Sequence, residues 1–191
     1  MAQNSLTHES DIILKTPTSV LRPWSAEDRI SLAMHADNPN IAASMRDGFP
    51  SPYTLADADR FLTMATGDHP QILLAVTVDD QAIGGIGVHL LEDIYHRTAE
   101  IGYWLSEQYW GQRIITDAVR ALIPVAFMNS EIIRIQAGIF SNNPGSMRVL
   151  EKNGFILEAV HKKAITKHGE VLDEHLYVLF RDDHAVESLD S

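Results

Sequence analysis

The sequence has no cysteine among its 191 residues, so disulfides, thiolate metal sites and cysteine nucleophiles are excluded. No apolar run approaches about 18 residues, so no membrane helix is expected. The polar start MAQNSLTHESD has no apolar core of the kind found in a secretory signal. A cytoplasmic protein is therefore the default expectation.

Basic residues are scarce: 15 Lys and Arg stand against 26 Asp and Glu, a net charge of −11. Nucleic-acid binding needs a basic surface and is therefore not expected. The acidic excess lies mainly in residues 1–110, which carry six basic and fifteen acidic side chains. One interpretation is a solvated acidic surface. The other is a first part that faces a cationic partner and a second part that tolerates an anion.

An apolar content of 45% and the chain length suit one soluble domain. The periodicity predicts, in order, a strand, two helices, three strands, a helix, a strand, a helix and two strands. This order is typical of an α/β (α+β) domain with a mainly antiparallel sheet. We expect the domain to span 17–183, between flexible ends at 1–16 and 184–191. Pro124 predicts a kink or a break in the long helix.

The stretch QYWGQR, residues 108–113, follows an apolar strand and precedes an amphipathic helix. A helix N-terminus presents free N–H groups and the positive end of the helix dipole, which suit a diphosphate. One glycine at such a junction is weak support by itself. The glycine–lysine–serine/threonine ending of a P-loop is missing, and the stretch lacks the three glycines and the parallel crossover of a dinucleotide-binding fingerprint.

Six segments occur in a characteristic order and spacing along residues 18–181: LRPW, PYTLADADRFL, AEIGYWLSEQYWGQ, DAVRAL, NNPGSMRVLEKNGF and DEHLYVL. Together they resemble the GNAT superfamily of acetyl-CoA-dependent N-acetyltransferases, and most of all its branch of ribosomal-protein N-terminal acetyltransferases. The resemblance implies a GNAT fold. That fold has a mixed, mainly antiparallel twisted sheet of about seven strands, flanked by about four helices, with splayed central strands.

The resemblance implies acetyl-CoA as cosubstrate and no metal. The pyrophosphate pattern Gln/Arg-x-x-Gly-x-Gly/Ala falls on Gln108, Gly111 and Arg113. Because the family accepts alanine at the last place, Arg113 is interpreted as needing no positive φ. Its guanidinium is left with three alternatives: facing outward, contacting phosphate, or impairing binding. The full set of implied cofactor-binding residues is Tyr103, Trp104, Leu105, Gln108, Gly111, Gln112, Arg113, Asn143, Arg148 and Lys152.

Two catalytic residues are implied. Where many superfamily members have a tyrosine acid, this chain has Leu150, whereas Ser146 matches the serine of the ribosomal-protein branch. Its hydroxyl would hydrogen-bond the thioester sulfur and relay a proton. Glu100 is the first candidate for the base, and it shares a strand face with Gly102. The structural alternatives are a helix-start serine and a surface carboxylate paired with Arg97 or a lysine.

His89 is the rival base, and His35 is a weaker one. No His-x-His or HExxH spacing exists, so a catalytic metal is not expected. Phe49 and Tyr53 are candidates for the lining of an acceptor cleft, with His89 beside them.

The expected acceptor is a cationic amine, first a protein N-terminus and second a small-molecule amine. A non-catalytic acyl-CoA-binding regulatory module is the alternative of a different class. The sequence leaves monomer and homodimer open.

Overall fold

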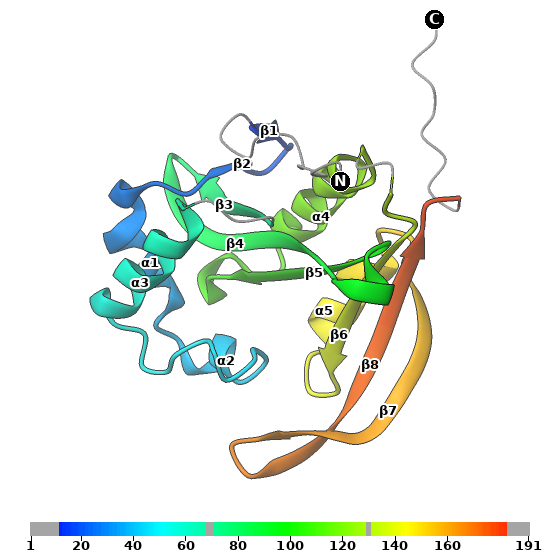
Figure 1. Ribbon diagram of the computed structural model, residues 1–191. Coiled ribbons are helices and arrows are strands. Elements are labelled where there is room, and N and C mark those ends of the chain that lie inside the picture. The colour runs from blue at the N-terminus through cyan, green and yellow to red at the C-terminus, as the bar shows by residue number, and fades with distance from the viewer. Residues whose placement is uncertain (1–11, 68–70, 129–130, 183–191) are drawn as a thin grey trace, which may run out of the picture.

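The computed structural model describes residues 12–67, 71–128 and 131–182. Their strands form one eight-stranded sheet in the order β1-β2-β3-β4-β5-β6-β8-β7 (Figure 1). Neighbouring strands are antiparallel except β5 and β6, which are parallel. The strands are β1 (Leu14–Lys15), β2 (Val20–Pro23), β3 (Ile72–Val78), β4 (Gln81–Leu90), β5 (Thr98–Leu105), β6 (Arg134–Phe140), β7 (Ile156–Lys167) and β8 (Glu170–Phe180).

Helices cover both faces of this sheet. The bounds are α1 (Arg29–Ala36), α2 (Pro39–Ala42), α3 (Leu55–Ala65), α4 (Ile114–Met128) and α5 (Pro144–Glu151), with 3-10 turns η2 (Ala26–Asp28), η3 (Asp93–Tyr95) and η4 (Glu107–Tyr109). Apolar residues of α4 and α5 form one core with the sheet, and those of α1 and α3 form a second core. Successive residues of β3 divide between the two cores: Leu74 and Val76 join the first, Leu73 and Ala75 the second. The two helix pairs therefore lie on opposite faces.

Local signals position the helices next to the site. The Thr54 hydroxyl accepts the Asp57 amide at 3.3 Å, and the Asp57 carboxylate accepts the Thr54 amide at 2.7 Å, which starts α3 as a capping box. At the start of α5 the Asn143 side chain accepts the Ser146 amide at 3.1 Å. Pro124 lies inside α4, which runs from Ile114 to Met128 as one helix. The expectation of two helical pieces is wrong, because the buried face of α4 is held by the core on both sides of the proline.

The N-terminal boundary differs from the expectation of a flexible segment through residue 16. Leu14 and Lys15 pair with β2 as β1, and Ile12 is buried in the core of α4 and α5. Apolar burial thus extends the sheet by one strand beyond the predicted start. Residues 1–11 and 183–191 lie outside the described residues.

The centre of the sheet opens between β5 and β6. Only Thr98, Ala99 and Glu100 of β5 pair with β6. Beyond Glu100, β5 stays paired with β4 as far as Leu105, while β6 follows β8 as far as Phe140. Residues 101–105 and 137–140 therefore border a wedge between two strands that have separated. The prediction of splayed central strands is confirmed.

The long β7–β8 hairpin curves under the molecule toward the loop after α2 (Figure 1). Near the hairpin turn, the buried ammonium of Lys167 contacts the Asp47 carboxylate at 2.8 Å. This contact ties the last hairpin of the sheet to the loop that precedes α3. No helix among the described residues is long and apolar enough to cross a membrane.

Candidate active site

The opening between β5 and β6 has different chemistry on the two faces of the sheet. Tyr103 and Leu105 of β5 pack on the side of α4 and α5, and Trp104 packs on the side of α1 and α3. Alternation along the strand places Glu100 on the same side as Trp104. Ser146, near the start of α5, lies on the side of Tyr103. A molecule seated in the opening can therefore meet groups from both faces.

On the α5 side, two hydroxyls form a partly buried pair. The Tyr103 and Ser146 hydroxyl oxygens lie 2.7 Å apart, and the Tyr103 hydroxyl also donates to the Ser146 carbonyl at 3.3 Å. The Ser146 amide donates to the Asn143 side chain at 3.1 Å, which fixes the start of α5. Burial raises the pKa of Tyr103 far above its usual value, so the phenol keeps its proton at neutral pH.

Sequence reasoning missed the side chain of Tyr103. It assigned only backbone binding to that residue, because Tyr103 and Ser146 are 43 positions apart and no spacing rule links them. Leu150, which replaces the common tyrosine acid, is fully buried in the core. The hydroxyl pair therefore supplies the O–H groups that face this side of the opening.

On the other side, Glu100 is held by an ion pair. An Arg46 guanidinium nitrogen lies 2.6 Å from a Glu100 carboxylate oxygen, and the Glu100 side chain is 24% exposed. The expected partner Arg97 is not used. Its Nε donates to the Glu131 carbonyl at 3.1 Å instead. Arg46 comes from the loop after α2, so this loop reaches across to the edge of the opening.

His89 is the cross-strand partner of Glu100. Since partners across antiparallel strands point to the same face, the two candidate bases are neighbours at the opening. His35 lies elsewhere. It is buried, and its Nδ1 is 3.0 Å from the Ser106 hydroxyl and 3.4 Å from the Gln108 amide nitrogen. His35 is therefore removed from the candidates for the base, and the Gln108 side chain is turned toward it.

The QYWGQR segment forms η4 and a short turn into α4. Gly111 and Arg113 have positive φ angles, +75° and +66°. The interpretation that the Arg113 position needs no positive φ is therefore wrong: the turn into the helix demands a left-handed residue even though the side chain is arginine. The Arg113 carbonyl accepts the Asp117 amide at 2.9 Å, the first bond of the helix.

Three exposed amides of this turn face solvent at the helix start. Within the described parts of the chain, the amides of Gly111, Gln112 and Arg113 donate to no acceptor. This is the arrangement that a diphosphate needs. Arg148 on α5 and Lys152 just after it are also exposed.

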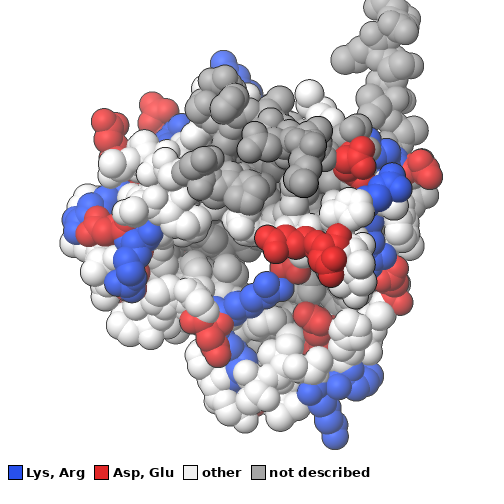
Figure 2. Space-filling view, in the orientation of Figure 1, with Lys and Arg blue, Asp and Glu red and all other residues white. Residues whose placement is uncertain are grey.

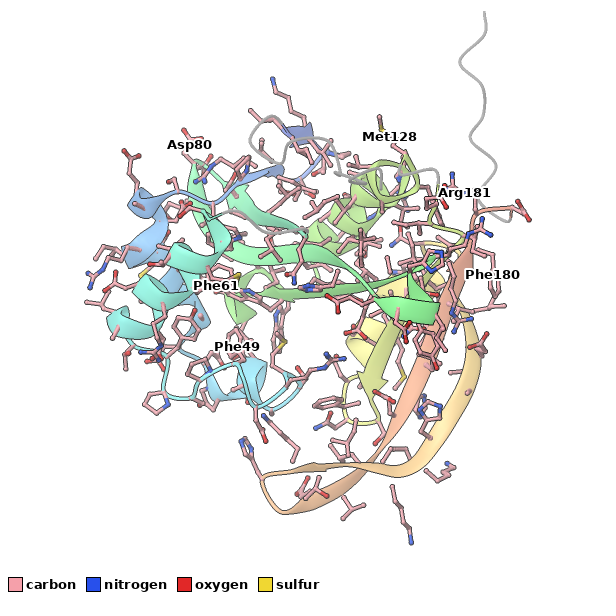
Figure 3. The ribbon with its side chains drawn as sticks, viewed as in Figure 1. Phe49, Phe61, Asp80, Met128, Phe180 and Arg181 are labelled. Carbon is pink, nitrogen blue, oxygen red and sulfur yellow. The ribbon has the colours of Figure 1, made fainter. Side chains whose placement is uncertain are left out.

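A cavity of about 450 Å³ lies on the α1 and α3 side. It is lined by the three residues that the sequence suggested for an acceptor cleft, Phe49, Tyr53 and His89. Trp24 and Phe61 line it too, although neither was among the lining candidates named from the sequence. Figure 3 shows that Phe49 and Phe61 come from different elements, the loop after α2 and α3. Trp104 completes the aromatic wall with its side chain.

Comparison with known proteins agrees with this geometry. The acetyltransferase (GNAT) domain family matches residues 19–156. The chain is 36% identical over 105 residues to the probable N-acetyltransferase YjcK of Bacillus subtilis (strain 168) and 38% identical over 104 residues to the ribosomal-protein-serine acetyltransferase of Escherichia coli (strain K12). These alignments cover 55% and 54% of the chain and 58% of each relative, so the chain matches just over half the length of these relatives.

Among solved structures, RimJ of Mycobacterium smegmatis in complex with a CoA-disulfide superposes with a TM-score of 0.78 at 21% identity, covering 90% of this chain and 87% of that one. At that identity the likeness establishes the fold. The splayed sheet, the glycine turn before α4 and the family match over residues 19–156 all indicate the same family. The chain belongs to the GNAT acetyltransferase family.

Proposed function

We propose that the chain transfers an acetyl group from acetyl-CoA to a primary amine, in the first place the N-terminal amine of a protein. The observation that carries the proposal is the opening between β5 and β6, which has the Tyr103–Ser146 hydroxyl pair on one face and Glu100 on the other. Acyl transfer from a thioester to an amine needs an acid for the thiolate and a base for the amine. These groups are supplied from opposite sides of one gap.

The cofactor would lie along the freed edge of β5. Residues 101–105 do not pair with β6, so the outward backbone groups of Ile101 and Tyr103 would bond the pantetheine arm as an added strand does, whereas the Leu105 carbonyl accepts the Trp110 indole N–H at 2.8 Å. The amides of Gly111, Gln112 and Arg113 would then hold the diphosphate. Arg148 and Lys152 are the further cations nearest in sequence to Asn143 and Ser146 for the nucleotide phosphates.

The chemistry is a direct displacement. The neutral amine attacks the thioester carbon and forms a C–N bond, and the C–S bond breaks. The amine's proton passes to Glu100, directly or through water, with His89 as the alternative acceptor. The thiolate takes a proton from the Ser146 hydroxyl, which Tyr103 holds in place and which regains its proton from solvent. Protons and charge balance without an acetylated intermediate on the protein.

The protein N-terminus is placed first because of the 38% identity to an enzyme named for ribosomal-protein serine acetylation. A small-molecule amine is the second candidate, with the same chemistry. A non-catalytic acyl-CoA-binding module would bind the cofactor without turnover.

Mass spectrometry of products tests the proposal. The protein is incubated with acetyl-CoA and a mixture of peptides with free N-termini, blocked N-termini and polyamines. We expect acetylation at free peptide N-termini and none at blocked ones. Ser146→Ala is the control for chemistry, and it should slow product formation. Acetylated polyamines without acetylated peptides would favour the second candidate, and acetyl-CoA binding without any product would favour the binding module.

A further inference from the structure

The floor of the aromatic cavity is built from glycines of β4 and β5. Gly85 and Gly87 are the cross-strand partners of Trp104 and Gly102. A Cβ atom at Gly85 would lie 2.8 Å from the Trp104 indole nitrogen, so the absent side chain lets the indole lie against the strand. A Cβ at Gly102 would meet nothing within 4 Å. The space over Gly102 is therefore empty.

Gly102 connects this cavity to the reaction site. It lies two residues beyond Glu100, the last residue of β5 that pairs with β6. It shares the strand face of Glu100 and lines the cavity. An amine beside Glu100 at the opening therefore has the cavity directly next to it, and the carbon skeleton that bears the amine can extend across Gly102.

The walls of the cavity are aromatic and packed against one another. The Trp24 and Phe61 rings meet edge to face with centroids 5.1 Å apart. The Phe49 ring centroid lies 5.2 Å from that of Tyr53 and 5.8 Å from that of Trp104. Such contacts hold rings in fixed positions. A volume of about 450 Å³ lies within the range of small-ligand pockets and leaves room for a large apolar side chain.

Charge in the cavity is already compensated. Asp57 and Arg60 are its only described lining residues with a formal charge, and they pair with each other. The Asp57 carboxylate also accepts the Thr54 amide at 2.7 Å. Burial raises the pKa of Tyr53 to about 12, so that phenol is neutral. On the visible face of the molecule, acidic and basic side chains lie next to one another (Figure 2). A second ammonium, as in a polyamine, has no spare carboxylate to bind here.

We propose that this cavity selects acceptors whose amine is borne by a large apolar group, so that a preferred protein N-terminus begins with an aromatic or branched aliphatic residue. This proposal rests on the proposed function and specifies its acceptor. Transfer of an apolar side chain from water into the cavity is favourable. Serine or alanine would leave most of the cavity unfilled, and lysine would bring an uncompensated charge into it.

A peptide series tests the preference. The peptides are identical except for a first residue of phenylalanine, leucine, serine or lysine, and kcat/KM is measured for each with saturating acetyl-CoA. We expect phenylalanine and leucine to exceed serine by at least about tenfold, since even one methylene in a fitted apolar pocket is worth roughly that much. Lysine should be the poorest. A serine peptide equal to or better than the phenylalanine peptide overturns the proposal.

Phenethylamine and a polyamine, assayed beside the peptides, separate this proposal from the proposed function. Turnover of phenethylamine with no turnover of peptides would support the cavity's role and reject the protein N-terminus as acceptor. Turnover of serine peptides alone would reject the cavity's role and leave acetyl transfer standing. No turnover of any amine would reject both.

Variants of the wall identify the cavity as the cause. Phe61→Ala removes one ring and should lower the ratio of kcat/KM for phenylalanine over serine peptides by about tenfold. Tyr95→Ala is the matched control, because Tyr95 is an aromatic residue on η3 that is 61% exposed and does not line the cavity. Gly102→Val places a side chain in the empty space and should lower the same ratio. Because a ratio of kcat/KM values is measured, a general loss of activity in a variant does not change the result. An unchanged ratio in both Phe61→Ala and Gly102→Val would contradict the proposal.

Discussion

The hydroxyl oxygens of Tyr103 and Ser146 lie 2.7 Å apart, across the boundary between β5 and α5. The phenol is buried and keeps its proton, because burial raises its pKa well above the usual range. Its single proton is shared between the Ser146 hydroxyl and carbonyl oxygens, which leaves the serine proton free to point at a departing sulfur. Tyr103 acts in this arrangement as a positioning residue for Ser146.

A double-mutant cycle tests this pairing. Ser146→Ala should lower kcat by about 100-fold, in the range of general acid catalysis. Tyr103→Phe should lower kcat by about tenfold and leave the KM for acetyl-CoA nearly unchanged, because only the orientation of the serine is lost. The double variant should be no slower than Ser146→Ala alone, since residues that act as a unit are not additive. Fully additive losses would mean that the two hydroxyls act separately.

Glu100 is expected to matter most at low pH. Glu100→Gln removes the carboxylate and should reduce kcat by about 100-fold near neutral pH. At higher pH hydroxide can take the proton that the attacking amine loses, so the deficit should shrink there. His89→Asn is the matched variant on the neighbouring strand, and it should show a smaller loss. A larger, pH-dependent loss in His89→Asn would transfer the role of base to that histidine.

We expect the left-handed backbone of Arg113 to lower the free energy of unfolding, and its side chain to have little effect on it. A left-handed conformation costs a residue with a Cβ about 1 kcal/mol, and Arg113 has φ +66°. Arg113→Gly should therefore raise the free energy of unfolding by about 1 kcal/mol, while Arg113→Ala should not. Urea unfolding measures both.

The same two variants settle what the guanidinium does. Acetyl-CoA affinity should persist in both, because the amide that faces the diphosphate remains. Equal weakening in glycine and alanine would instead show a guanidinium–phosphate contact, and tighter binding in both would show an obstruction.

His35 should make stability pH-dependent. Burial lowers its pKa below the ordinary value of about 6.5. The folded state therefore favours the neutral ring, and this contribution is present in full above about pH 6.5 and is lost as the pH falls through the lowered folded-state pKa. His35→Gln keeps a hydrogen-bonding group but cannot titrate.

Urea unfolding of the wild type, His35→Gln and the exposed control His96→Gln measures the effect. Below about pH 6.5 the free energy of unfolding should fall less steeply in His35→Gln than in the wild type and His96→Gln. The same slope in all three proteins would remove His35 as the cause.

Much of the fold was predictable because its signals are local. The N-caps at Thr54 and Asn143 and the period-two strands depend on residues close in sequence. The order of six segments then predicted the splayed sheet. The candidate site was harder to predict from the sequence. The Arg46–Glu100 ion pair joins residues 54 positions apart, and the aromatic cavity joins residues of α1, α3, β3, β4 and β5 and of the loops between them.

Such contacts follow from sheet register and loop path, which no short pattern encodes. The positive φ of Arg113 was also hidden, because arginine rarely adopts it and glycine or asparagine would have signalled it.

Free thiol released from acetyl-CoA, followed with and without a peptide that begins with phenylalanine, tests the central claim most directly. The account predicts thiol release that depends on the free amine, saturates with the peptide, is matched by one acetylated N-terminus per thiol and falls sharply in Ser146→Ala. Thiol release at the same rate without any amine, or acetyl-CoA binding with no release at all, would contradict it.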